Sequence, residues 1–245
     1  MRRKTFDHIA LGVCYAIGAA TQYQEEALMD FEKQRRIMVD SQVRVNDVTE
    51  PSIVSAFLTV PRETFVPKSA QSIAYSETEI SAGEGRAMWT PRDLGKMLRA
   101  MAPQAGDLAL VIGAGAGYSS ALLGRIVETV IALEDNAEAV DLMTERFASI
   151  GMDQAIAVEG DLSNGLPEQG PFEAILVAGM VETVPEVWLQ QLAEGGRLGV
   201  VVSESRALGS ARVYTKAGEN ASYREAFECC PPVLPGFEKA ETFVF

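Results

Sequence analysis

The feature that most constrains the fold of this chain is a set of three glycines at alternate positions, Gly113, Gly115 and Gly117. They directly follow the apolar run of residues 108–112 and precede the small and apolar residues 118–123. A buried strand, a tight glycine turn and a helix start make a place where the backbone approaches a ligand closely. A dinucleotide-binding loop needs its third glycine at the position that Tyr118 occupies here. The spacing therefore indicates a ligand-binding turn of another kind.

Carboxylates follow the next two predicted strands. Glu134 and Asp135 come about twenty residues after the glycine loop, and Asp161 follows the strand after that. The first acid can accept hydrogen bonds from both ribose hydroxyls of a nucleoside, and Asp161 can accept one from an adenine amino group. Each acid could equally be a solvated turn residue or a helix cap, and the glycines a plain turn. Because three successive strand ends carry matching chemistry, we favour a nucleoside pocket.

From residue 108 onward, predicted strands and helices alternate. The predicted strands span residues 108–112, 130–134, 155–159, 173–178 and 197–203, and residues 213–215 and 240–245 are candidate late strands. Such alternation implies parallel strands joined by crossover helices. The predicted fold class is α/β, a doubly wound, mostly parallel sheet with helices on both faces and an N-terminal helical extension. Ligands of such sheets bind beyond the carboxyl ends of the strands, where the glycines and acids fall.

The predicted domain organisation has three parts. Residues 1–28 form an N-terminal extension whose order the sequence leaves open. Residues 29–104 form a helical region with a substrate-side loop, and residues 105–245 form the ligand-binding domain. The charged and apolar pattern of the extension superficially resembles a signal peptide. We instead expect a helical extension, or extra residues upstream of a natural start near Met29.

Local patterns predict further elements around the sheet. Residues 30–57 show one helical pattern, and residues 83–86 form a flexible glycine-rich loop. Pro91 suits the first turn of a helix that runs to about Met101. A later helix is expected to include Trp188 and Leu192.

Composition excludes several classes of function. The formal net charge of −13 argues against binding to a phosphate backbone, so no nucleic-acid partner is expected. No stretch is long and apolar enough to span a bilayer, so no membrane partner is expected. The three cysteines lack metal-ligand spacing and the single histidine, His8, lies outside the ligand-binding domain, so no metal site is expected. The cysteine usage predicts a reducing, cytoplasmic location, and we expect a monomer or weak homodimer.

Several short motifs together resemble one family. They are Met38–Arg44, Val60–Arg62, Phe65–Pro67, Ala74–Tyr75, Val111–Tyr118, Phe172–Val177 and Gly195–Leu198. In these segments the chain resembles the protein-L-isoaspartate O-methyltransferases, which repair damaged proteins by methylating isoaspartyl residues. The alternate glycines are also similar to the first motif of S-adenosylmethionine-dependent methyltransferases. The resemblance covers roughly residues 35–205 and implies a Rossmann-like methyltransferase sheet.

The resemblance implies S-adenosyl-L-methionine as the cofactor and isoaspartyl-containing proteins or peptides as partners. The residues implied at the cofactor site are Gly113, Gly115, Gly117, Glu134, Asp161, Leu162 and Ala178. The methyl acceptor would be a carboxylate, which has a reference pKa of about 4 and is ionised at neutral pH. The transfer then needs no general base, and it depends on alignment and a dry pocket.

The chain departs from the family pattern in residues 83–91. The family usually carries Gly-x-Gly-Gln-Thr-Ile-Ser-x-Pro, whose hydroxyls belong to the active site. Here the threonine is Ala87 and the serine is Trp89, while Thr90 offers a hydroxyl one residue along. Val111 stands where the family has an acid, which predicts weaker cofactor binding. The lost hydroxyls predict weaker isoaspartyl methyltransferase activity than in relatives.

Three residues of this segment are candidates on the substrate side. Thr90 is the candidate catalytic residue. Arg86 is a candidate substrate-binding residue that could hold a carboxylate through a two-pronged contact, or else a solvent-exposed loop charge. Trp89 is a candidate substrate-binding residue that serves as a packing wall or lid rather than in catalysis.

Other functions are open on the sequence alone. One is a catalytically weakened, S-adenosylmethionine-binding or regulatory homologue, which Ala87, Trp89 and Val111 favour. Another is a carboxyl methyltransferase with a different acceptor. A nucleotide-dependent oxidoreductase is the third, and Tyr118 in the glycine loop argues against it.

Overall fold

The computed structural model describes residues 30–83, 85–205 and 208–238, without the side chains of residues 204 and 205. The chain divides into two units, Met1–Gln34 and Arg35–Phe245. The described part of the first unit is short and includes the start of helix α2 (Phe31–Met38). The predicted extension over residues 1–28 and the candidate strand over residues 240–245 lie outside the described residues.

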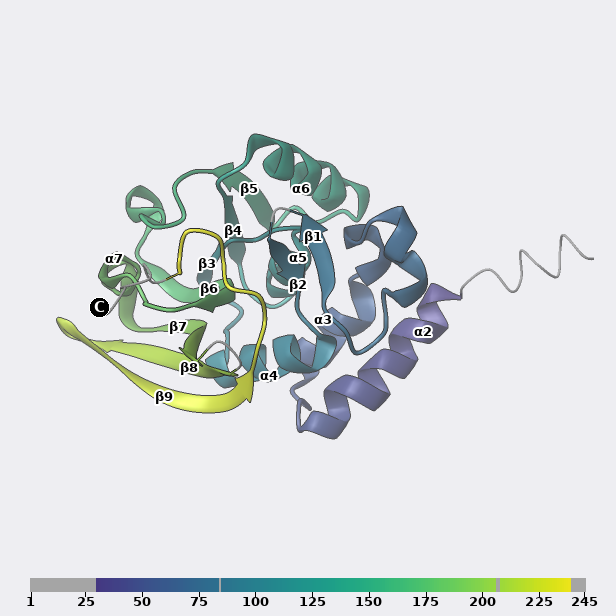
Figure 1. Ribbon diagram of the computed structural model, residues 1–245, viewed down its shortest axis with the longest axis horizontal. Coiled ribbons are helices and arrows are strands. Elements are labelled where there is room, and N and C mark those ends of the chain that lie inside the picture. The colour runs from purple at the N-terminus through teal and green to yellow at the C-terminus, as the bar shows by residue number, and fades with distance from the viewer. Residues whose placement is uncertain (1–29, 84, 206–207, 239–245) are drawn as a thin grey trace, which may run out of the picture. The chain divides into compact units, whose positions relative to one another are not determined.

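A seven-stranded sheet forms the centre of the second unit (Figure 1). In spatial order its strands are β5 (Ala155–Glu159), β4 (Thr129–Glu134), β3 (Leu108–Ile112), β6 (Phe172–Val181), β7 (Leu192–Ser205), β8 (Leu208–Ala217) and β9 (Asn220–Cys229). The strands from β5 to β7 are parallel, while β8 and β9 pair antiparallel. The predicted mostly parallel α/β sheet is confirmed. Each of the five predicted strands lies within an observed strand, and residues 213–215 lie within β8.

The sequence does not predict β9, one of the two edge strands of the sheet. Most of its side chains are exposed, so it lacks the apolar alternation that marks a half-buried strand. It is held instead by its pairing with β8, which runs from Gly209 opposite Cys229 to Ala217 opposite Asn220.

Helices cover both faces of the sheet. They are α4 (Pro91–Met101), α5 (Tyr118–Gly124), α6 (Ala137–Ser149) and α7 (Glu186–Gln190). Figure 1 shows α7 on the opposite side of the sheet from α4 and α5. On the α7 side, Leu110 and Ile112 of β3 pack in one buried cluster with Trp188. On the other side α4 comes so close to β7 that a Cβ on Gly199 would lie 2.5 Å from Met101 Sδ.

The single helix predicted over residues 30–57 is wrong. The segment contains α2, a π-helical turn, a 3-10 turn and α3, with bounds Phe31–Met38, Val39–Val43, Arg44–Asn46 and Pro51–Thr59. Asp47 adopts a left-handed conformation with φ of 62°, which ends the first helical stretch. Pro51 then starts α3 at a position where its missing N–H costs nothing. Short 3-10 turns follow at Arg62–Phe65, Lys68–Ile73 and, later in the chain, Pro167–Gln169.

The predicted glycine-rich loop over residues 83–86 joins two short strands that pair with each other, and its flexibility stays a prediction. Strands β1 (Ile80–Gly83) and β2 (Arg86–Met88) form a separate two-stranded antiparallel sheet. Gly83 and Gly85 have φ values of 89° and 75°, which explains why this turn requires glycine. The predicted helix from Pro91 to Met101 is confirmed as α4.

The helix that contains Trp188 is shorter than predicted. Helix α7 ends at Gln190, and Leu192 instead begins β7, paired with Phe172 of β6. The carbonyl of Gln191 accepts a hydrogen bond from the Phe172 N–H, which draws the chain into the sheet before the two predicted helix-ending glycines. None of the described helices is both long and apolar enough to cross a membrane. The predicted domain boundary near residue 104 stays a prediction.

Candidate functional site

The glycine loop joins β3 to α5 in a left-handed backbone conformation. Gly113, Gly115 and Gly117 have φ values of 68°, 56° and 91°. Residues that carry a side chain rarely adopt such positive φ values. The alternate glycines therefore meet three separate backbone requirements. The N–H groups of Gly113 and Ala114 both donate to the carbonyl of Leu133, which fixes the loop against β4.

Glu134 ends β4 beside this loop and is only 1% exposed. Its Oε1 accepts a hydrogen bond of 2.6 Å from the Gly115 N–H, and its Oε2 accepts one of 3.2 Å from the Asp135 N–H. The predicted placement of this acid next to the glycine loop is confirmed. Both carboxylate oxygens are held by the backbone at the carboxyl end of the parallel strands.

Arg86 of β2 reaches the same carboxylate. Its Nε donates to Glu134 Oε1 and its Nη2 to Glu134 Oε2, both at 3.1 Å, and Nη2 also donates to Asp135 Oδ1 at 2.8 Å. Burial by itself lowers the pKa of Arg86, but the hydrogen bonds and charges of the two acids outweigh burial and raise that pKa. At 8% exposure, Arg86 is not the solvent-exposed loop charge considered from the sequence. Its proposed contact with a substrate stays a prediction.

Asp161 lies after β5 and has an exposed carboxylate. Ser163 Oγ and Asn164 Nδ2 donate to its two oxygens, each at 2.7 Å. The hydrogen bonds from the Ser163 hydroxyl and backbone lower the pKa of Asp161, so this acceptor is ionised at neutral pH. Asp161 and Leu162 line a cleft of about 600 Å³ that Asp135 also borders.

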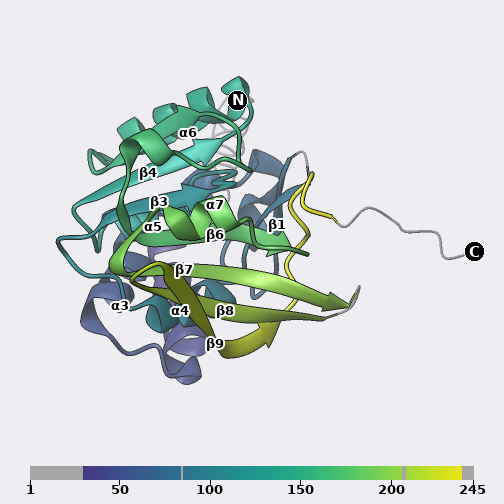
Figure 2. The same ribbon diagram turned by 90° about the vertical axis from the view of Figure 1, so that its left-hand side faces the viewer.

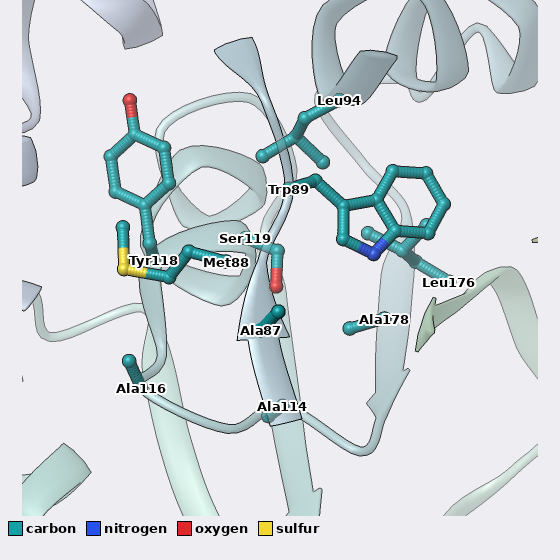
Figure 3. Close-up of a pocket in the computed structure, with 10 residues that line it drawn as sticks. All are labelled: Ala87, Met88, Trp89, Leu94, Ala114, Ala116, Tyr118, Ser119, Leu176 and Ala178. Atoms are coloured by element: carbon teal, nitrogen blue, oxygen red, sulfur yellow. The ribbon is translucent and has the colours of Figure 1, made fainter. Parts of the chain in front are cut away.

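A small cavity lies between the glycine loop and β2 (Figure 3). It is lined by Ala87, Met88, Trp89, Leu94, Ala114, Ala116, Tyr118, Ser119, Leu176 and Ala178. Its free volume is about 20 Å³, which is room for about one water-sized group. Apart from Ser119 and the polar ends of Trp89 and Tyr118, the lining side chains are apolar, so the cavity has few groups that could hold water.

Trp89 supplies a hydrogen-bond donor to this cavity. The side chain is 4% exposed, and its Nε1 has no partner among the described residues. Figure 3 shows the indole nitrogen and the Ser119 hydroxyl turned toward the space near Ala87 and Ala178. A buried donor without an acceptor is costly, so this geometry points to a ligand atom or a water in the cavity.

Thr90 follows Trp89 but is not among the residues that line the cavity. Its Oγ1 accepts a hydrogen bond of 3.1 Å from the Asp93 N–H and so caps helix α4. The cap uses the hydroxyl oxygen as an acceptor only. A catalytic role for Thr90 stays a prediction.

Sequence reasoning missed the part that Arg62 plays. This arginine is fully buried, and it donates from Nε to the Ala74 carbonyl at 2.7 Å and from Nη2 to the Trp89 carbonyl at 2.8 Å. Its guanidinium carbon lies 4.7 Å from the centre of the Tyr118 ring, and burial lowers the pKa of Arg62. Arg62 thereby fixes the backbone of Trp89 next to the glycine loop. The short motif around Arg62 marked the family but did not indicate burial.

A segment after β9 was also missed. It passes beside β6 (Figure 2), where the Met180 N–H donates to the Pro232 carbonyl and the Leu234 N–H to the Met180 carbonyl. The Leu234 side chain is buried over Gly113 and Gly179. The next residues of this segment, Pro235, Gly236 and Phe237, line the cleft that holds Asp161.

The structure brings the sequence-predicted cofactor residues to one edge of the sheet. The glycine loop follows β3, Glu134 ends β4, Asp161 follows β5, and Ala178 lies in the last part of β6. Val111 is fully buried inside β3 and pairs with Ala132 and Leu176, and the weaker cofactor binding predicted from this position stays a prediction. Among the described residues, no group of three or more His, Cys, Asp or Glu is arranged to hold a metal ion.

Comparisons with known proteins agree on one family. The family model "Protein-L-isoaspartate(D-aspartate) O-methyltransferase" matches residues 24–230. Protein-L-isoaspartate O-methyltransferase 2 of Pelobacter propionicus is 32% identical over 209 residues, which cover 85% of this chain and 92% of the relative. The protein-L-isoaspartate O-methyltransferase of Petrotoga mobilis is 34% identical over 175 residues, which cover 71% of this chain and 82% of the relative.

Solved structures give the same result. A protein-L-isoaspartate O-methyltransferase matches with a TM-score of 0.72 and 26% identity, over 84% of this chain and 66% of that chain. A putative enzyme of the same name from Plasmodium falciparum, in complex with S-adenosyl-L-homocysteine, matches with a TM-score of 0.68. It is 18% identical over 84% of this chain and 98% of its own, which shows a shared fold. This chain belongs to the protein-L-isoaspartate O-methyltransferase family.

Proposed function

We propose that this protein transfers a methyl group from S-adenosyl-L-methionine to the carboxylate of isoaspartyl residues in damaged proteins, in the cytoplasm. The observation that carries the proposal is the contact between the glycine loop and Glu134, closed by the 2.6 Å hydrogen bond from Gly115. Two relatives that are about a third identical to this chain over most of its length are named for this reaction, which supports the proposal.

The residues at the edge of the sheet fit the cofactor. Glu134 would accept from the ribose hydroxyls and Asp161 from the adenine amino group, with Leu162 against the base. The glycine loop and Ala178 would face the methionine end. The fit is supported by the left-handed glycines, which bring bare backbone to the site, and by the ionised Asp161 at the edge of a cleft of about 600 Å³.

The cofactor would supply an electrophilic methyl group on a sulfonium. The residues around the small cavity have the complementary task of aligning the acceptor carboxylate and keeping water out. The alanines at positions 87, 116 and 178 and Leu176 provide the dry wall. Trp89 Nε1 is proposed to donate to one oxygen of the acceptor, which leaves the other oxygen to attack.

Two more residues are proposed to contact the acceptor. Arg86 would bind the carboxylate through its planar pair of donors. Thr90 would donate its hydroxyl hydrogen, since the helix cap uses only the oxygen. We infer that the protein acts without a nucleic-acid or membrane partner, as a monomer or weak homodimer.

A second candidate is a cofactor-binding homologue with weak catalysis or a different acceptor. It is favoured by the small cavity, in which Ala87 and Trp89 stand where relatives carry hydroxyls and only about 20 Å³ is free. Calorimetry with S-adenosylmethionine and NAD side by side, followed by labelled methyl transfer to an isoaspartyl peptide, separates the candidates. Binding and transfer support the enzyme, and binding without transfer supports the second candidate. Binding of NAD alone would contradict both.

A further inference from the structure

The carboxylate of Glu134 has no room for another hydrogen-bond donor. Oε1 already accepts from Gly115 N and Arg86 Nε, at 2.6 and 3.1 Å. Oε2 accepts from Asp135 N and Arg86 Nη2, at 3.2 and 3.1 Å. An ionised carboxylate offers about four acceptor positions, so this one is saturated.

A ribose would need these same oxygens. The two backbone donors are fixed by the fold, since Gly115 belongs to the left-handed loop and Asp135 directly follows β4. Arg86 is a side-chain donor from another element, β2. Arg86 is therefore the group that can give way when Glu134 binds a ribose.

Arg86 has space to move into. Its side chain lines a cleft of about 440 Å³ between the β1–β2 turn and the start of α6, which Gly83 and Asn136 also border. Its Nη1 has no hydrogen-bond partner in the described part of the chain. Ala116 borders both this cleft and the small cavity, and Ala87, the next residue along β2, lines that cavity.

A guanidinium that leaves a buried carboxylate needs another anion. Breaking a buried ion pair without replacement is strongly unfavourable. Asp135 already accepts from Arg86 Nη2 at 2.8 Å, but its side chain is 48% exposed, and Glu138 of the same cleft is also exposed, so neither replaces a buried partner. The carboxylate of the methyl acceptor would supply the missing negative charge at the adjoining cavity.

We propose that Arg86 exchanges Glu134 for the acceptor carboxylate when the nucleoside cofactor binds. Arg86 then determines specificity for an anionic acceptor. It also couples the cofactor site to the acceptor site, so that the cofactor binds first. This inference rests on the proposed function. Because coupling is reciprocal, cofactor and acceptor each raise the affinity for the other, by about 5-fold or more.

The test uses the full chain, S-adenosylhomocysteine and a fluorescent isoaspartyl peptide, so that no turnover is needed. Calorimetry measures S-adenosylhomocysteine binding, and anisotropy measures peptide binding with and without it. We expect S-adenosylhomocysteine to strengthen peptide binding to the unmodified protein. In Arg86→Gln we expect S-adenosylhomocysteine itself to bind about 5-fold or more tightly, because its competitor is gone, and the coupling to be lost.

Two further variants keep the experiment decisive. Arg99→Gln removes an arginine on α4 that is paired with Glu50 at 3.3 Å and half exposed, and it should change neither affinity. Arg86→Lys retains the charge without the planar fork, so it should bind S-adenosylhomocysteine more tightly than the unmodified protein and show weaker coupling. This variant carries the comparison if Arg86→Gln does not fold. Weaker S-adenosylhomocysteine binding or unchanged coupling in the Arg86 variants overturns the exchange alone. If the unmodified protein does not bind S-adenosylhomocysteine, the proposed function fails with it.

Discussion

Leu234 fills the space above Gly179 so closely that a Cβ on this glycine would lie 2.4 Å from Leu234 Cγ. The contact fastens the segment after β9 to β6, next to the glycine loop. Gly179→Ala should lower the free energy of unfolding by about 1–3 kcal/mol, because the added methyl overpacks a buried contact. Urea unfolding measures the loss.

A double variant tests the cause of that loss. Leu234→Ala alone should cost about 2–5 kcal/mol by leaving a cavity. If the clash with Leu234 is the cause, Gly179→Ala/Leu234→Ala should cost less than the sum of the single changes. Strict additivity would show that the contact is not the reason. Gly106→Ala is the control, since no atom lies within 4 Å of the place that its added Cβ would take.

Arg62 predicts a second effect on stability. Arg62→Lys keeps the charge but loses the two directed hydrogen bonds to the Ala74 and Trp89 carbonyls. Hydrogen bonds to charged groups contribute about 1.5–3 kcal/mol each, so the loss should be about 3 kcal/mol. Thermal unfolding should show a Tm lower by about 6–12 °C. The exposed Arg99→Lys should change the Tm very little, and an equal effect of both changes would refute the role given to Arg62.

The proposed ribose acceptor gives a prediction on binding. Glu134→Gln should weaken S-adenosylhomocysteine binding by about 1.5–3 kcal/mol, since a charged acceptor is lost. Calorimetry checks this, with the exposed Glu145→Gln on α6 as the matched control. Unchanged affinity in Glu134→Gln would place the nucleoside elsewhere.

Trp89 gives a prediction on the acceptor. Trp89→Phe removes the unpartnered indole donor while keeping an aromatic wall. We expect kcat/KM for an isoaspartyl peptide to fall about fivefold, as for one lost hydrogen bond, with S-adenosylhomocysteine affinity unchanged. Ala87→Thr/Trp89→Ser, which restores the hydroxyls of relatives, should raise turnover above that of Trp89→Phe. An unchanged kcat/KM in Trp89→Phe would reduce Trp89 to a packing residue.

The sequence predicts those features that local patterns encode. The apolar runs predict the five parallel strands, and the alternate glycines mark three left-handed residues before α5. Because parallel strands end at one edge, the position of Glu134 near the loop also follows from the sequence. The buried pairing of Arg86 with Glu134 joins residues 48 positions apart and depends on how the β1–β2 turn packs.

Two other features escape prediction for physical reasons. Leu234 contacts the glycine loop through a segment with no periodic pattern of its own, so only the folded structure shows the contact. The edge strand β9 is mostly exposed and is defined by pairing with β8, which a single strand's composition does not reveal. Tertiary packing rather than local propensity determines both.

Methyl transfer from labelled S-adenosylmethionine to an isoaspartyl peptide, measured beside the same peptide with ordinary aspartate, tests the proposed function most directly. We expect transfer to the isoaspartyl peptide, inhibition by S-adenosylhomocysteine, and no transfer to the aspartyl control. Equal labelling of both peptides, or no labelling of either at saturating cofactor, would contradict the proposed function.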